Sequence, residues 1–304
     1  MNSTSLASYV ELHRSGELAN RAAEAAKHLK SCDLCARYCY VNRLRTLKGA
    51  VCHTGEKAVL HSFGPHHGEE NPLRGTRGSG TIFFSWCNLR CQFCQNWEIS
   101  QKGLGQEVSA KELAKIMLKL QQQGCHNINF VSPSHVVAQI IAAVDIAVAN
   151  GLHLPLVYNT GGYDSPEALS LLDGIIDIYM PDMKYADSEI AHHYSHVRNY
   201  AQINRAAVKE MHRQVGDLVL DDNGIAVRGL LIRHLVLPND LAGTEDILKF
   251  IAEEISTNTY INIMDQYYPC YRAGDYPQLN RQISPTEYQQ AIQAANKNSL
   301  FRLD

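Results

Sequence analysis

The chain has 304 residues, of which 45% are hydrophobic and 19% charged, and its formal net charge is −3 at pH 7. This length suits one large domain, or a domain with an appendage. The balanced charge argues against a nucleic-acid partner. The first residues lack the basic and apolar regions of a signal peptide, and Gln139 and Asp145 interrupt the longest apolar run, which argues against a membrane span. We therefore expect a cytoplasmic protein.

Short apolar runs alternate with helical patterns along most of the chain. An alanine-rich segment predicts a helix over 16–30, and the Gly-, His- and Pro-rich segment 54–80 predicts an irregular loop. Asn223-Gly224 predicts the turn of a small hairpin over 217–229. Six strands alternating with helices predict a parallel α/β sheet with helices outside it. The strands are expected at 81–84, 127–131, 155–159, 175–180, 230–237 and 260–264, and the helices at 109–124, 135–151, 165–174, 187–215, 243–255 and 284–298.

Polar motifs follow the first four of these strands. In parallel α/β folds, ligands bind at the carboxyl ends of the strands, so these motifs are expected to meet on one rim and to form an active site. They are Cys87, Cys91 and Cys94 after the first strand, Ser132 and Ser134 after the second, Asn159 and Thr160 after the third, and Met180, Asp182 and Lys184 after the fourth.

Seven of the nine cysteines fall into two groups, and disulfides are unexpected in a reducing compartment. We name Cys87, Cys91 and Cys94 the three-cysteine loop. Their C-x3-C-x2-C spacing favours a four-iron cluster in which one iron has no protein ligand, and an open coordination position is a reactive one. A zinc knuckle with a ligand from elsewhere, or plain buried cysteines, are the structural alternatives.

The second group, which we name the four-cysteine set, has the spacing C-x2-C-x3-C-x12-C. Four thiolates make a closed site, and zinc and an accessory iron–sulfur cluster both remain open. His53 is an alternative ligand because it follows the last of these cysteines directly. The set consists of Cys32, Cys35, Cys39 and Cys52.

The sequence resembles the radical S-adenosylmethionine (radical SAM) enzymes, and in particular pyruvate formate-lyase activating enzyme homologues of the PflX type. The segments that carry the resemblance are TIFFSWCNLRCQFCQNWEIS, INFVSPSH, YNTGGYDSPEAL, DIYMPDMKY, LLIRHLVLPN and NIMDQYYPCYRAG. The resemblance implies a partial (β/α)6 barrel, a [4Fe-4S] cluster, and reductive cleavage of SAM to methionine and a 5′-deoxyadenosyl radical that abstracts hydrogen. It also implies an electron donor such as flavodoxin or ferredoxin.

The resemblance further assigns roles to single residues. Gly-Gly-Glu, which grips the SAM amino group in the family, is replaced here by Ser132-Pro133-Ser134-His135, and a histidine expected after the sixth strand is Tyr268. A hydroxyl or carbonyl of Ser132 or Ser134 would then accept from the ammonium. The remaining implied contacts are Phe93 and Asn96 to the adenine side, Lys184 and Arg233 to SAM and substrate, and Asn159, Thr160, Met180 and Asp182 to a monovalent cation, Na⁺ or K⁺.

We expect two parts, an appendage over 1–75 that carries the four-cysteine set and a radical SAM core barrel over 76–304. Two function classes stay open. The first is an activating or modifying enzyme for a protein or peptide, and the second is a radical SAM enzyme for a small molecule or cofactor precursor.

Overall fold

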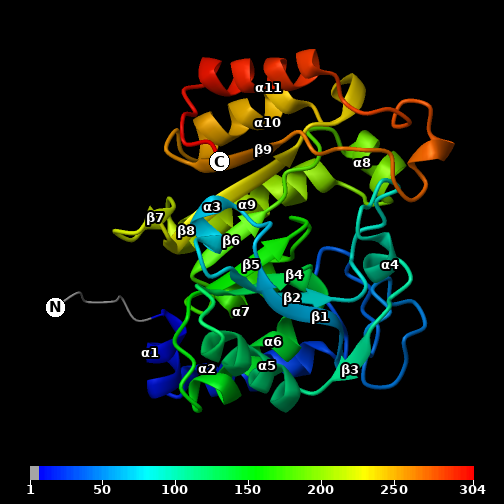
Figure 1. Ribbon diagram of the computed structural model, residues 1–304. Helices are drawn as coiled ribbons and strands as arrows, with labels where there is room; N and C mark the ends of the chain where they lie inside the picture. Colours follow the sequence, from blue (N-terminus) through cyan, green and yellow to red (C-terminus); the bar gives the residue numbers. More distant parts are fainter. Residues whose placement is uncertain (1–6) are drawn as a thin grey trace.

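The computed structural model describes residues 7–304. Its centre is a sheet with the strand order β3-β1-β2-β4-β5-β6-β8-β7, and β9 pairs with β8 (Figure 1). Strands β2, β4, β5, β6, β8 and β9 are parallel neighbours, in that order. They run as β2 (Ser79–Phe84), β4 (Ile128–Val131), β5 (Leu156–Thr160), β6 (Ile178–Pro181), β8 (Ala226–Leu235) and β9 (Tyr260–Met264).

Helices cover the outside of this parallel run. Figure 1 shows α5 and α6 towards one end of the run of strands and α10 and α11 towards the other. A capping box at Ser109 and Glu112 begins α5, and Ser284 and Glu287 form the same motif before α11. From residue 110 onwards the helices are α5 (Ala110–Gln122), α6 (Val137–Val148), α7 (Pro166–Leu172), α8 (Ser188–Ser195), α9 (Tyr200–Val215), α10 (Thr244–Phe250) and α11 (Pro285–Lys297). A π-helical turn lies at Ile251–Ile255, and short 3₁₀ turns lie at Pro133–His135, Pro238–Asp240 and Ala273–Asp275.

The six predicted parallel strands are all present, and so is the hairpin. Strand β7 (Val219–Leu220) pairs antiparallel with β8, and Gly224 adopts the left-handed φ of +76° that the turn requires. The expected helical region 187–215 divides into α8 and α9, because His196 and Asn199 between them also have positive φ. The predicted α/β partial barrel is therefore confirmed.

The prediction of an irregular loop over 54–80 is wrong. This segment contains β1 (Ala58–His66) and α3 (Asn71–Arg74), and β1 pairs antiparallel with β2. On its other side β3 (Gln106–Val108) pairs only with Ala58–Leu60, so Pro65 lies where β1 is an edge strand and its missing N–H breaks no ladder. Gly and Pro are tolerated in β1 because they lie on this free edge. Since these residues are otherwise typical of loops, the sequence did not indicate a strand here.

The N-terminal region packs onto the barrel through α1 (Tyr9–Arg14) and α2 (Glu17–His28). Leu18 and Ala25 of α2 belong to the same buried apolar cluster as Ile140 of α6. The following segment, 29–57, contains no helix or strand and carries the four-cysteine set. The division of the chain at residue 75 stays a prediction. Strand β1 belongs to the same sheet as the barrel strands, and α2 packs into the same apolar core.

Within residues 7–304, no helix has both the length and the apolar character needed to cross a membrane.

Candidate active site

The three-cysteine loop follows β2 at the carboxyl end of the parallel strands. A short helix, α4 (Trp97–Ser100), follows the loop, and Asn96 is its N-terminal cap residue. The loop is tied to α8 by backbone hydrogen bonds from Arg90 N to Ser195 O, 3.0 Å, and from Gln92 N to Tyr194 O, 2.8 Å. These contacts hold the cysteines at the mouth of the barrel, where the sequence predicted a site.

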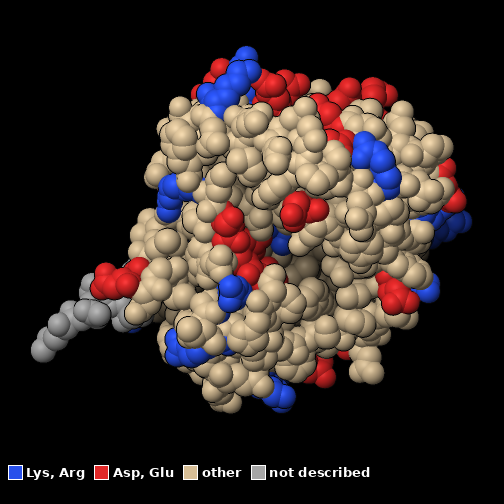
Figure 2. All heavy atoms as spheres, turned by 45° about the horizontal axis from the view of Figure 1, so that its top comes forward, with Lys and Arg blue, Asp and Glu red and all other residues tan. Residues whose placement is uncertain are grey.

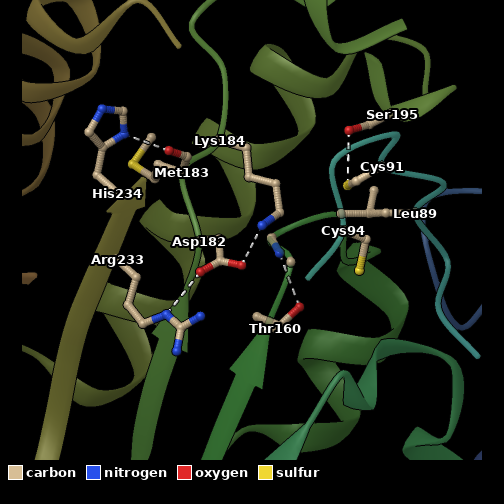
Figure 3. A network of polar contacts seen from close by, with 12 residues as sticks. Leu89, Cys91, Cys94, Thr160, Asp182, Met183, Lys184, Ser195, Arg233 and His234 are labelled. Carbon is tan, nitrogen blue, oxygen red and sulfur yellow. Dashed lines mark hydrogen bonds and ion pairs between the residues drawn. The ribbon is translucent and has the colours of Figure 1, made fainter. Parts of the chain in front are cut away.

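Each sulfur of this loop has a hydrogen-bond donor. The N–H of Leu89 lies 3.3 Å from Cys87 Sγ, the hydroxyl of Ser195 donates to Cys91 Sγ at 3.0 Å (Figure 3), and Ser100 Oγ lies 3.1 Å from Cys94 Sγ. Donors to sulfur stabilise the thiolate form that iron requires and tune the reduction potential of a cluster.

The protonation of these thiols agrees with a metal-binding role. Burial raises the pKa of Cys87 to about 11 and that of Cys94 to about 12, and it also raises the pKa of Cys91. Without metal these thiols stay protonated at neutral pH, so binding of iron would release their protons. Among residues 7–304, no three His, Cys, Asp or Glu side chains lie close enough together to bind one ion. The donor set fits a cluster better than a single ion.

The three-cysteine loop opens onto a cavity of about 360 Å³ at the barrel mouth. Figure 2 shows a hollow in this face of the molecule, with charged side chains at its edge and inside it. Its volume is at the lower end of the range for ligand and cofactor sites, about 300–1,000 Å³. Eleven of the predicted residues line it: Cys87, Cys91, Cys94, Phe93, Asn96, Ser132, Asn159, Thr160, Asp182, Lys184 and Arg233.

A buried charge triad crosses this cavity from β6 to β8 (Figure 3). Asp182 accepts from Lys184 Nζ at 2.7 Å through one carboxylate oxygen and from Arg233 Nε at 3.0 Å through the other. Burial alone would raise the pKa of the Asp182 carboxyl, but the positive charges of Lys184 and Arg233 outweigh it and hold that pKa below its usual range. Arg233 Nη1 also lies 3.9 Å from Oε1 of the buried Glu70, so two cations and two carboxylates meet on this side of the cavity. Lys184 and Arg233 are the groups here that suit a carboxylate of a ligand.

Because both carboxylate oxygens of Asp182 are engaged, little negative charge is left for the predicted monovalent cation, which stays a prediction. Two other residues assigned to the site lie elsewhere. Met180 packs in an apolar cluster with Leu73 and Ile178. Ser134 Oγ lies 2.9 Å from Thr160 Oγ1, and neither Ser134 nor Met180 lines the cavity.

Thr160 is held in place by the chain that follows it. Its hydroxyl donates to Asp164 Oδ2 at 2.7 Å and accepts from the N–H of Gly162 at 3.1 Å. Gly162 has a φ of +73°, and a Cβ there would come within 2.5 Å of the Asp182 carbonyl oxygen, so only glycine fits. Gly162 thus allows the chain after β5 to approach the end of β6 closely.

Glu69 is a site residue that the sequence analysis missed. It comes from the β1–α3 connection, lines the same cavity, and has a side chain that is only 7% exposed. Burial raises its pKa to about 7, and the negative charge of Glu70 adds to this effect, whereas Arg233 opposes it. The pair Glu69-Glu70 inside the supposed loop 54–80 was the only signal. Glu69 restores a carboxyl to a cavity that lacks the family's Gly-Gly-Glu, while Tyr268 is 46% exposed and does not line it.

A six-stranded parallel partial barrel that carries a C-x3-C-x2-C loop at its mouth is the architecture of an enzyme that generates radicals from SAM. Residues 81–251, more than half of the chain, match the family described as Radical SAM superfamily. The chain therefore belongs to the radical SAM superfamily and is a radical SAM enzyme. Membership implies a [4Fe-4S] cluster and SAM, and the cysteine loop and the cavity fit both.

The chain is also similar to the Uncharacterized protein MJ0674 of Methanocaldococcus jannaschii, with 35% identity over 288 residues that cover 91% of this chain and 78% of the relative. Among solved structures, a radical SAM methyltransferase from Sphaerobacter thermophilus has 12% identity and a TM-score of 0.48, over 74% of this chain and 65% of that one. A domain of pyruvate-formate lyase-activating enzyme from Bacteroides vulgatus has 14% identity and a TM-score of 0.38, over 64% of this chain and 89% of that one. Similarity this low indicates no substrate.

Proposed function

We propose that this radical SAM enzyme acts on a protein or peptide, as a PflX-type homologue of the pyruvate formate-lyase activating enzyme. The observation that carries the proposal is the open mouth of the cavity (Figure 2). The cavity has room for about one cofactor-sized ligand, so SAM would fill much of it. A substrate would then approach from solvent and insert only its reacting part, which suits a flexible segment of a larger molecule.

When bound, the cluster and SAM supply a 5′-deoxyadenosyl radical that abstracts hydrogen from a glycine Cα or a side chain. The residues of the chain bind and orient the reactants. The positive end of the charge triad, Lys184 and Arg233, would receive the SAM carboxylate, and Phe93, which packs edge-on against Tyr267 with ring centroids 5.9 Å apart, would cover the adenine side. Ferredoxin or flavodoxin would be the electron donor.

The alternative, a small molecule or cofactor precursor as substrate, is favoured by one observation. The cavity contains buried charges of both signs, since Glu69 lies near Arg233. A small zwitterion would pair with both.

The test is an anaerobic assay of the reduced, reconstituted enzyme with SAM. Candidate proteins and peptides would be compared with candidate small molecules, with 5′-deoxyadenosine and a new organic radical as readouts. A polypeptide that stimulates 5′-deoxyadenosine formation and carries the radical or the modification supports the proposal. Stimulation by small molecules alone would favour the alternative, and absence of SAM cleavage under all conditions would contradict both.

A further inference from the structure

The four-cysteine set lines one small void next to Asn88 of the three-cysteine loop. Cys32 and Cys35 are 8% exposed, and Cys52 is 7% exposed. The void is lined by all four cysteines together with Leu34, Arg37, Val41, Arg43, Ala50, Asn88 and His135.

A buried cation donates a hydrogen bond to one of these sulfurs. Arg43, which is 3% exposed, places Nη1 3.5 Å from Cys32 Sγ. The three-cysteine loop also has a donor close to sulfur, since the N–H of Leu89 lies 3.3 Å from Cys87 Sγ. Such donors favour thiolates, which are the ligand form for metals.

Two further polar atoms at this void have no partner. Arg37 Nη2 and His135 Nδ1 are buried, and neither finds a hydrogen-bond partner within residues 7–304. A buried guanidinium N–H without an acceptor is costly, and an anionic group inside the void would relieve that cost. These unpaired polar atoms indicate that the void suits an anionic centre.

How close the four sulfurs lie distinguishes between the two metals that the sequence spacing leaves open. Zinc lies about 2.3 Å from each thiolate in a tetrahedral site, which brings the four sulfurs to about 3.8 Å from one another, in contact. No water-sized body fits among sulfurs so close. Here no three Cys, His, Asp or Glu side chains within residues 7–304 lie close enough together to hold one ion, and the void that the four thiols line admits a water-sized body. The four thiols thus surround more space than one ion fills.

We propose that the four-cysteine set holds a second [4Fe-4S] cluster with one cysteine on each iron. Because every iron has a protein ligand, this cluster would not bind SAM, unlike the cluster of the three-cysteine loop. His53 is not a ligand, since it packs on the Trp86 ring, 4.6 Å between centroids, and does not line the void.

The second cluster would lie beside the first. Asn88, which lines the void, is the neighbour of Cys87, which lines the SAM cavity. Arg37 Nε donates to the Asn88 carbonyl oxygen at 2.7 Å, and the amide of Asn88 donates to the Tyr163 carbonyl at 2.8 Å. Ala36 N donates to the same carbonyl at 3.4 Å. The two cysteine segments are therefore joined by direct contacts on both sides of Asn88.

The test uses the full chain, reconstituted anaerobically, with iron, sulfide and zinc measured per chain. The parent should hold about eight iron and eight sulfide ions, and a Cys87→Ala/Cys91→Ala/Cys94→Ala variant should keep about four of each. Reduction of that variant should give an electron paramagnetic resonance signal that SAM does not change. The reciprocal Cys32→Ala/Cys35→Ala variant should also hold about four iron ions, but its signal should change when SAM is added. Cys125→Ala, at a buried cysteine apart from both groups, is the matched control and should hold about eight.

The proposal is overturned if the triple variant holds about one zinc and no iron, which would make the set a structural zinc site. It is equally overturned if that variant binds neither metal, or if the Cys32→Ala/Cys35→Ala variant keeps all eight iron ions. The two variants remove different cysteines, so a failure of either one to fold leaves the other to decide. None of these results depends on the substrate of the enzyme.

Discussion

The two cysteine groups differ in what surrounds them. The three-cysteine loop extends from a strand of the barrel and faces a charged cavity of about 360 Å³ that is open to solvent. The four-cysteine set lies within a segment without helix or strand, and its void is much smaller, about 10 Å³. A site that takes a substrate needs both an open coordination position and adjacent space, whereas a closed site needs neither. The three-cysteine loop has both, and the four-cysteine set has neither.

The largest expected effect separates the two groups by activity. Cys87→Ala, Cys91→Ala or Cys94→Ala should abolish formation of 5′-deoxyadenosine from SAM, since three ligands leave no replacement. Cys32→Ala/Cys35→Ala should keep measurable cleavage, because its three-cysteine loop is intact. The measurement is SAM cleavage with a chemical reductant, which needs no substrate. Full activity in any of the three single variants would show that the loop is not the site.

The next effect concerns the charge triad that only the open site has. Asp182→Asn leaves Lys184 and Arg233 buried without their shared partner, and breaking a buried ion pair costs about 3–5 kcal/mol. We expect at least about a tenfold loss of SAM affinity together with a lower Tm, and a smaller loss for Asn159→Ala.

The matched control for Asp182→Asn is Asp173→Asn, which removes an ion pair with Arg213 on the exposed surface and should change little. SAM affinity and Tm would be measured on all three variants. If Asp182→Asn bound SAM as the parent does, Asp182 would be only a structural residue at the end of its strand.

A third prediction uses the pH dependence of Glu69. In the folded protein its pKa is about 7, above the ordinary glutamate value of 4.5, because of burial and the neighbouring Glu70 and Asp182, against the opposing charge of Arg233. The folded state therefore binds the proton more tightly, and the stability from this group falls as the pH rises from about 4.5 to 7. His66, 3.5 Å away, is the other titratable neighbour.

Glu69→Gln mimics the protonated carboxyl and should remove this loss. Relative to the parent, its Tm should rise by roughly 5–10 °C between pH 5 and pH 8, since the shift of the Glu69 pKa corresponds to about 2.5 kcal/mol over this range. Thermal unfolding at both pH values is the measurement, and Glu107→Gln, at an exposed glutamate, should show no such change. An equal shift in both variants would mean that Glu69 is not specially buried.

The smallest expected effect lies at the contact between the two cysteine segments. Arg37→Lys loses the paired hydrogen bonds to the carbonyl oxygens of Asn88, 2.7 Å, and His196, 2.6 Å. We expect SAM cleavage to fall by about two- to fivefold with the iron content unchanged. The measurement is the initial rate at saturating SAM. A rate equal to that of the parent would show that the two segments function independently.

Much of the fold could be predicted from the sequence because its signals are local. The six parallel strands and the hairpin at Asn223-Gly224 follow from apolar runs and turn residues within a few positions. Strand β1 could not be predicted in the same way. Its Gly and Pro residues are typical of loops, and only its pairing with β2 and the short reach of β3 make Pro65 acceptable.

By itself, the sequence determined which cysteines form the two groups. The spacing of the cysteines along one loop fixes which thiols can converge, because a few residues of chain limit how far apart they lie. Only the tertiary structure decided what surrounds them. Glu69 and Arg233 come from segments far apart in the chain, and Asp182 lies between two cations that its own strand does not both supply. Such contacts depend on how the barrel closes and on burial, which changes the pKa of Glu69 and the charge balance of the cavity, and no local pattern of residues encodes them.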